Sequence, residues 1–163
     1  MASPLQAGSK ALPILPASAW PSALGDAAKE VFSMMVGAEI TVALGQKLPV
    51  HADVTGVIGI GGAFSGVFSL RCSKGSATKI ASQMLGVPEE DAFSQAADAI
   101  GEICNMVAGL FKAKIGHEAT CMLSIPTVIT GKDYSVHSSR CAEIEMPLLY
   151  RDEPVWITLD IRK

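Results

Sequence analysis

The sequence predicts an α+β fold in which long helices pack on one face of a largely antiparallel sheet. Apolar residues recur at helical spacing over residues 22–37, 74–86 and 89–115. Segments with strand composition lie between and after these helices, and the last two are typical of an antiparallel hairpin. A near copy of residues 26–37 recurs at 98–109, a constant offset of 72, which predicts an internal pseudo-two-fold repeat.

The N-terminal residues differ from the rest of the chain. Residues 1–20 are rich in proline, and we expect a flexible tail there, followed by a single domain over 21–163. The apolar run 11–15 imitates part of a signal peptide, but Pro13 interrupts it and Pro16 follows it. No segment reaches the roughly 18 uninterrupted apolar residues that a membrane-spanning helix needs. We therefore expect a cytoplasmic protein with no membrane contact.

Composition and charge limit the possible partners. The chain has 163 residues, of which 49% are hydrophobic and 18% charged, so it can bury a core without disulfides. Its net charge is −3 and its Lys and Arg residues are scattered singly, which argues against a nucleic acid partner. The histidines and cysteines show no metal-ligand spacing, so we expect no metal bound by this chain alone. The cysteines are interpreted as reduced core thiols; they are Cys72, Cys104, Cys121 and Cys141.

The first half of the chain is expected to form a helix, an ambiguous stretch and a hairpin. Pro21 precedes the helix 22–37. Residues 38–44 alternate in polarity and form either a strand or irregular structure. Residues 52–72 predict a hairpin around a glycine-rich turn. The glycines at 59–66 also admit a phosphate-binding loop, which we favour less because a strand rather than a helix follows them.

The second half is expected to contain two helices and then strands. The helix 74–86 ends at a glycine, and three acidic residues begin the next helix, 89–115, at its positive N-terminal end. Residues 120–129 have strand composition. Residues 142–150 and 155–161 are predicted to pair as an antiparallel hairpin.

One face of the predicted helix 89–115 carries a polar stripe. Its members are Asp98, Gly101, Glu102, Asn105, Gly109 and Lys112. The buried side is expected to come from Phe93, Ala97, Ile100, Cys104, Val107 and Phe111. Each glycine in the stripe costs about 1 kcal/mol of helix propensity relative to alanine. We interpret that cost as clearance for another molecule.

Glu102 and Asn105 are neighbours on this stripe. A polar stripe is common on amphipathic helices, so the spacing alone has an ordinary explanation as a solvated face. The chemistry favours a site, because an uncharged amide can orient a water molecule without repelling a phosphoryl group. A carboxylate beside it would repel that phosphate unless the partner presents a Lys or Arg. The pair is therefore interpreted as half of a site that another protein completes.

These residues also carry a family resemblance. Asp-x-x-x-Glu-x-x-Asn on a long helix, followed by Pro126 at the start of a strand, resembles the signature of the CheC/CheX/FliY family of chemotaxis phosphatases. Residues 30–37, 59–66 and 77–86 match other stretches of that family. The resemblance covers roughly residues 22–162. With one intact signature rather than two, the chain is most similar to the CheX branch.

The resemblance implies a function and roles for individual residues. The family hydrolyses the aspartyl phosphate of phosphorylated CheY-type receiver domains. Glu102 would pair with a receiver Lys, and Asn105 would position the attacking water. Asp98 and Pro126 would have supporting roles. The Mg²⁺ ion and the phosphoaspartate would belong to the receiver, so this chain needs no cofactor of its own.

The first copy of the repeat departs from the family pattern. Asp26 and Glu30 are present, but Ser33 replaces the asparagine, so we expect this vestigial copy to be inactive or buried in the pseudo-symmetric core. Members of this family with one site per chain form dimers joined through their sheets, so the resemblance implies a homodimer here. The alternative function is a non-catalytic receiver-binding adaptor or a module related to the flagellar switch.

Overall fold

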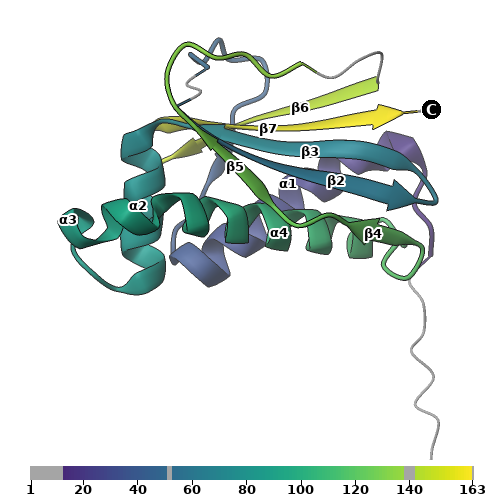
Figure 1. Ribbon diagram of the computed structural model, residues 1–163. Coiled ribbons are helices and arrows are strands. Elements are labelled where there is room, and N and C mark those ends of the chain that lie inside the picture. The colour runs from purple at the N-terminus through teal and green to yellow at the C-terminus, as the bar shows by residue number, and fades with distance from the viewer. Residues whose placement is uncertain (1–12, 51–52, 138–141, 163) are drawn as a thin grey trace, which may run out of the picture.

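The computed structural model describes residues 13–50, 53–137 and 142–162 (Figure 1). The helices are α1 (Trp20–Val31), α2 (Lys74–Leu85), α3 (Glu89–Ala92) and α4 (Ala96–Lys114). The strands are β1 (Thr41–Val42), β2 (Val54–Gly62), β3 (Ser65–Cys72), β4 (Cys121–Leu123), β5 (Thr127–Thr130), β6 (Ala142–Tyr150) and β7 (Glu153–Arg162). The predicted helices and strands are thus present, except that the long helix predicted over 89–115 is divided into α3 and α4.

The strands form one seven-stranded sheet, and every strand pair in the described chain is antiparallel. Their order is β1-β6-β7-β3-β2-β4, with β5 also paired to β2. This order is symmetric. At the centre, β3 of the first half pairs with β7 of the second half. On one side β1 of the first half pairs with β6 of the second, and on the other β4 and β5 of the second half pair with β2 of the first. Helices α1 and α4 lie together on one face of the sheet (Figure 1). The predicted fold class is therefore confirmed, and the topology carries the predicted repeat.

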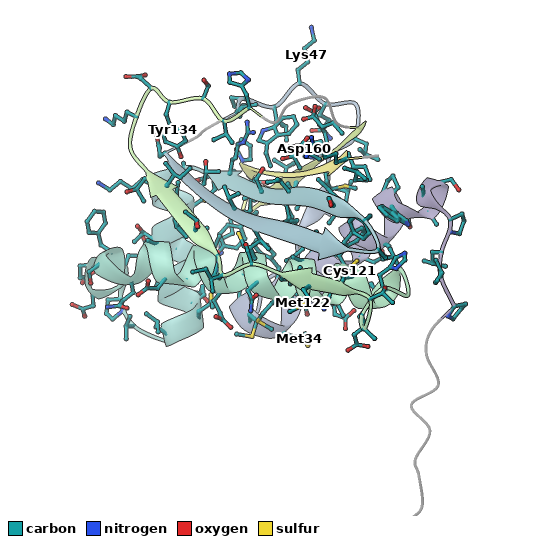
Figure 2. The ribbon with its side chains drawn as sticks, turned by 45° about the vertical axis from the view of Figure 1, so that its right-hand side comes forward. Met34, Lys47, Cys121, Met122, Tyr134 and Asp160 are labelled. Atoms are coloured by element: carbon teal, nitrogen blue, oxygen red, sulfur yellow. The ribbon has the colours of Figure 1, made fainter. Side chains whose placement is uncertain are left out.

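The opposite face of the sheet is polar. Figure 2 shows Lys47 and Tyr134 on this side, away from the helices. The Tyr134 hydroxyl lies 2.8 Å from Thr55 Oγ1 on β2, and the Ser69 and Thr158 hydroxyls form a buried hydrogen bond between β3 and β7. These contacts satisfy buried hydroxyls on the side of the sheet that no helix covers.

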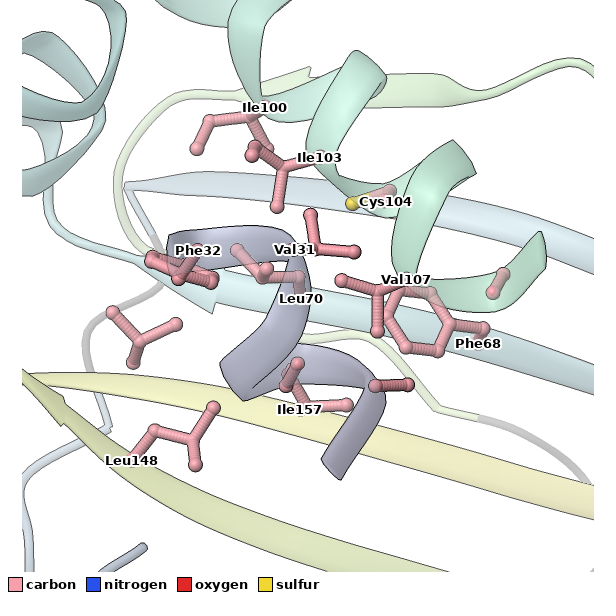
Figure 3. Close-up of a cluster of buried hydrophobic side chains, with 14 of the residues drawn as sticks. Val31, Phe32, Phe68, Leu70, Ile100, Ile103, Cys104, Val107, Leu148 and Ile157 are labelled. Atoms are coloured by element: carbon pink, nitrogen blue, oxygen red, sulfur yellow. The ribbon is translucent and has the colours of Figure 1, made fainter. Parts of the chain in front are cut away.

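The hydrophobic core lies between the sheet and the α1–α4 pair (Figure 3). Its central side chains include Val31, Phe32, Phe68, Leu70, Ile100, Ile103, Cys104, Val107, Leu148 and Ile157. Helix α4 approaches the sheet closely at Gly56, where an added Cβ would fall well inside van der Waals contact with Cys104 Sγ. The missing side chain at Gly56 therefore sets how near α4 lies to β2.

The long helix predicted over residues 89–115 is interrupted. A 3₁₀ turn at Phe93–Gln95 separates α3 from α4. Because a 3₁₀ turn has fewer residues per turn than an α-helix, it changes the direction of the side chain at position 93. Phe93 is 51% exposed, and Lys74 Nζ lies 4.4 Å from its ring centroid. The expectation that Phe93 belongs to the buried side of the helix was wrong.

Part of the predicted tail is packed against the domain. The Leu15 backbone N–H donates to the Ile115 carbonyl at 3.0 Å, and Trp20 is only 7% exposed. The Trp20 ring contacts Phe64 and Phe111, with centroid distances of 4.8 and 5.9 Å. Residues 13–20 therefore belong to the folded unit, while residues 1–12 lie outside the described residues.

The first helix and the stretch after it follow the prediction with two additions. Helix α1 continues through a π-helical turn, Phe32–Val36, and ends at Gly37, whose φ is +66°. The ambiguous stretch 38–44 contains only the two-residue strand β1. In the part of the chain that the structure describes, no helix is long and apolar enough to cross a membrane.

Candidate functional site

Helix α4 carries an exposed acidic and amide ridge, which we define as Asp98, Glu102 and Asn105. Residues spaced three and four apart lie on one side of a helix, so the three side chains are neighbours. The opposite side of α4 is fully buried against α1 and the sheet through residues such as Ile100 and Val107. The core therefore holds the helix rigidly while the ridge faces solvent.

The two glycines of the predicted stripe differ in what lies beside them. A Cβ on Gly101 would lie 3.4 Å from Val128 Cγ2 and 3.6 Å from Pro126 Cβ. A Cβ on Gly109 would lie 4.0 Å from Leu123 Cδ1. The chain itself occupies the space beside Gly101, so the interpretation was wrong there, whereas at Gly109 it stays a prediction. Pro126 and Val128 instead bring the β4–β5 segment onto α4 at Gly101.

The β4–β5 segment therefore passes beside Asn105. Gly101, Asn105 and Gly109 follow one another at intervals of four residues, about 6 Å along the helix axis. Since Pro126 contacts α4 at the first position and Leu123 at the last, the residues between them lie alongside Asn105. Pro126 thus shapes the surroundings of the ridge by packing on Gly101.

Lys112, the last member of the predicted stripe, has a structural role. Its Nζ donates hydrogen bonds to the carbonyl oxygens of Glu118 at 2.9 Å and Cys121 at 2.7 Å. These bonds hold the turn that leads from α4 into β4. Lys112 is consequently not part of the exposed ridge.

The two copies of the repeat have different ion pairing. Lys114 Nζ lies 2.9 Å from Glu30 Oε2, so the glutamate of the first copy is engaged by a lysine from α4. Within the described residues, neither Glu102 nor Asp98 has such an ion pair. The carboxylate of the second copy is therefore available to a cation on another molecule.

The first copy is exposed rather than buried. Asp26, Glu30 and Ser33 all face solvent and line an open cavity of about 470 Å³. The expectation of burial in the core was thus wrong, while the expectation that this copy is inactive stays a prediction. Ser33 also lies in the π-helical turn, whereas Asn105 lies in regular α-helix.

The described cysteines are unsuited to nucleophilic chemistry. Cys72, Cys104 and Cys121 are free and buried, as predicted for reduced core thiols; Cys141 lies outside the described residues. Burial raises the pKa of Cys72 to about 12. Burial, and to a lesser extent the charge of Cys72, also raises the pKa of Cys104 far above its usual range. Because only the thiolate attacks, a cysteine mechanism is disfavoured next to Asn105.

The residues that the structure describes contain no cluster of three or more His, Cys, Asp or Glu side chains able to hold a metal ion. Asp98 and Glu102 supply two carboxylates on one ridge, fewer ligands than a divalent cation usually takes from a dedicated protein site. The ridge is suited instead to contacting a charged surface on another molecule.

Sequence reasoning missed Ser124 and Ile125, which lie between β4 and β5 beside Asn105. Their position depends on contacts between segments far apart in the chain. The only local signal was the proline that follows Ile125, which marks an interruption of the strand.

A family model described as "Chemotaxis phosphatase CheX" matches residues 54–149, more than half of the chain. The chain belongs to the CheX family. The matched region includes the whole of α4 and both short strands beside it. The proposed signature residues of the second copy therefore lie within the part that defines the family, whereas the first copy lies outside the match.

Two CheX proteins illustrate the likeness. "CheY-P phosphatase CheX" from Thermotoga maritima is 37% identical over 90 residues, which cover 54% of this chain and 57% of that protein. The match thus spans little more than half of that relative. The crystal structure of CheX from Vibrio vulnificus has a TM-score of 0.74 and 26% identity, covering 88% of this chain and 96% of that one.

A third structure has the same fold at lower identity. It is a chain of the CheX–CheY–BeF₃–Mg²⁺ complex from Borrelia burgdorferi, with a TM-score of 0.72 and 18% identity. The likeness covers 88% of this chain and 98% of that one. At this identity it supports the fold.

Proposed function

We propose that this protein hydrolyses the aspartyl phosphate of a CheY-type receiver domain. One observation carries the proposal: Glu102 and Asn105 are exposed neighbours on an open ridge, and Glu102 has no ion pair among the described residues. An open ridge cannot enclose a small substrate. It is instead suited to entering a pocket on a partner that holds the phosphate, and a receiver domain is such a partner.

Asn105 orients the attacking water in this mechanism. Its amide oxygen accepts a hydrogen bond from the water while its N–H groups donate to neighbouring oxygens, and the group carries no charge that would repel the phosphoryl group. Little covalent chemistry is required of the protein in phosphoryl transfer, so catalysis is chiefly positioning. The buried side of α4 supplies the rigidity that such positioning needs.

Glu102 binds the partner in this mechanism by pairing with a receiver lysine. Asp98, four residues earlier on the same side of α4, adds negative charge that attracts the same basic group. Pro126 supports the site by packing on Gly101. The ridge thereby orients the receiver relative to Asn105 before hydrolysis.

The relatives support this proposal. The Thermotoga maritima protein is named a CheY-P phosphatase, and the Borrelia burgdorferi complex contains CheY, BeF₃ and Mg²⁺. We therefore assign the Mg²⁺ ion to the receiver and propose that this chain contributes no metal ligand. A receiver substrate also places the proposed activity in the cytoplasm.

A non-catalytic adaptor, or a module related to the flagellar switch, is the alternative. Binding alone would require charge and shape on the ridge but no particular group at position 105. The amide at Asn105, beside a glutamate suited to docking, favours hydrolysis over binding alone.

Phosphate release from a receiver domain tests the proposal. A purified receiver would be phosphorylated with a small phosphodonor and Mg²⁺, and release would be followed with and without this protein. We expect acceleration at substoichiometric amounts of the protein. Tight binding to a phosphorylated receiver without acceleration, across a panel of receivers, would favour the adaptor instead.

Replacing Glu102 with glutamine should weaken docking more than chemistry. We expect the KM for the phosphorylated receiver to rise about tenfold or more, because the variant loses an interfacial charge pair. The matched control is Glu30→Gln, which removes the corresponding carboxylate of the first copy and only a surface ion pair. An equal rise in KM for the two variants would contradict the assignment of docking to Glu102.

We also propose that the chain forms a homodimer. Strand β6 has nine residues, but β1 pairs only with Leu148 and Leu149. In the described chain, the rest of that β6 edge carries no neighbouring strand, and an open edge can pair with a second copy. Sedimentation at micromolar concentration should give the mass of a dimer. A monomer under those conditions would contradict this part of the proposal.

A further inference from the structure

A β-bulge interrupts the sheet edge beside Asn105. Thr127 pairs with Val57 and Leu123 pairs with Ile60. Residues 124–126 therefore oppose only residues 58–59, so the β4–β5 side has one extra residue. A bulge of this kind bends the strand and changes the direction of a side chain, and bulges are frequent next to functional sites.

The bulge is held firmly at both ends. The Ser124 backbone N–H donates to the Gly59 carbonyl at 2.8 Å, and the Gly59 N–H donates to Ser124 Oγ at 2.9 Å. Ser124 Oγ also donates to the Ile125 carbonyl at 3.0 Å. At the other end, Pro126 packs on Gly101 of α4. The backbone of Ile125 is therefore held by its neighbours on both sides.

The side chain of Ile125 projects into solvent. It is 84% exposed, although isoleucine is normally among the most buried residue types. Because Leu123 and Pro126 contact α4 one turn on either side of Asn105, Ile125 lies next to the proposed water-orienting group. An exposed apolar side chain in this position gains free energy if a docking partner removes it from water.

We propose that Ile125 is an apolar anchor that docks the phosphorylated receiver beside its phosphoaspartate. This inference rests on the proposed function and adds a specificity-determining residue to it. Ile125 would bury its side chain in an apolar depression of the receiver, while Glu102 supplies the charged contact. The occupant of this surface is therefore the same receiver that Glu102 and Asn105 engage.

The structure argues against a second copy of this chain at the same surface. A homodimer built by sheet extension needs a regular edge with free N–H groups. The edge next to Asn105 is broken by the bulge, and Pro126 has no N–H to donate. The surface is thus better suited to side-chain docking than to strand addition.

The Ile125→Ser variant tests the anchor. Its KM for the phosphorylated receiver should rise about tenfold while kcat stays within about twofold of the unaltered protein. The Kd for a receiver activated with BeF₃⁻ and Mg²⁺ should rise by the same factor as KM. The matched control is Leu44→Ser, because Leu44 is also exposed (67%) but follows β1 at the opposite edge of the sheet; its KM should not change.

The other outcomes separate the anchor from the proposed function. An unchanged KM and Kd for Ile125→Ser, with normal hydrolysis by the unaltered protein, would overturn the anchor alone. A loss of kcat without a change in KM would also overturn it, since Ile125 would then act through the position of Asn105. A lower sedimentation mass for Ile125→Ser would instead assign the side chain to a dimer interface. If the unaltered protein neither binds nor hydrolyses any phosphorylated receiver, the proposed function and the anchor both fail.

Discussion

Replacing Asn105 with alanine is expected to lower kcat for receiver dephosphorylation by about a hundredfold or more, because misplacing a reacting group by about 1 Å already has an effect of that size. Alanine cannot hold the attacking water, while the exposed position on α4 leaves the core unchanged. Binding to the phosphorylated receiver should persist through Glu102. The measurement is kcat and KM from phosphate release, with thermal unfolding to verify the fold.

Two further variants make the Asn105 test specific. Asn105→Asp preserves the shape of the side chain but introduces a negative charge that repels the phosphoryl group, so it should lose activity as well. Ser33→Ala alters the matching position of the first copy and should leave turnover unchanged. Undiminished activity of a folded Asn105→Ala protein would exclude the role of Asn105. Residual activity that disappears on further mutation of Glu30 and Ser33 would show that the first copy is active.

Replacing Gly56 with alanine is expected to destabilise the protein by about 1–3 kcal/mol, the usual range for overpacking a core. The added Cβ would overlap Cys104 Sγ and lie 3.2 Å from Ile100 Cγ2, so α4 must move away from β2. For a chain of this size, each kcal/mol lowers Tm by roughly 2–4 °C. Thermal unfolding of the variant measures the effect. Because α4 carries Asn105, hydrolysis should fall together with stability.

Two controls separate overpacking at Gly56 from other causes of lost stability. One changes another glycine of β2, and the other removes the Cys104 sulfur that the new Cβ would overlap. An added Cβ at Gly61, also on β2, would meet no atom within 4 Å, so Gly61→Ala should change Tm little. In the Gly56→Ala/Cys104→Ala double variant the overlapping sulfur is absent. Its loss of stability should be smaller than the sum of the two single losses. Simple additivity would show that Gly56 does not set the distance between α4 and the sheet.

The sequence by itself was sufficient for local structure and for the proposed pair on α4. Helical and strand periodicity depends on residues close in the chain, so α1, α2, both hairpins and the fold class could be predicted. Helix geometry alone predicts that Glu102 and Asn105 are neighbours, since residues three apart lie on the same side of a helix. The repeat was visible because its two copies keep the same spacing.

The tertiary structure decided which surfaces are free. Gly101 was interpreted as clearance for a partner, but Pro126 and Val128 occupy that space. These contacts join residues distant in the chain, so no local pattern reports them. The packing of residues 13–20 likewise depends on neighbours that are remote in sequence.

The sequence therefore determined the type of each main element, the repeat and the two polar residues that we propose for hydrolysis. Only the tertiary structure showed that Glu30 is paired with Lys114 while Glu102 has no ion pair in the described chain, and that the bulge presents Ile125 beside Asn105. The physical reason is that periodicity determines which side of an element a residue occupies. Packing between elements determines whether that side meets solvent, another segment or a partner.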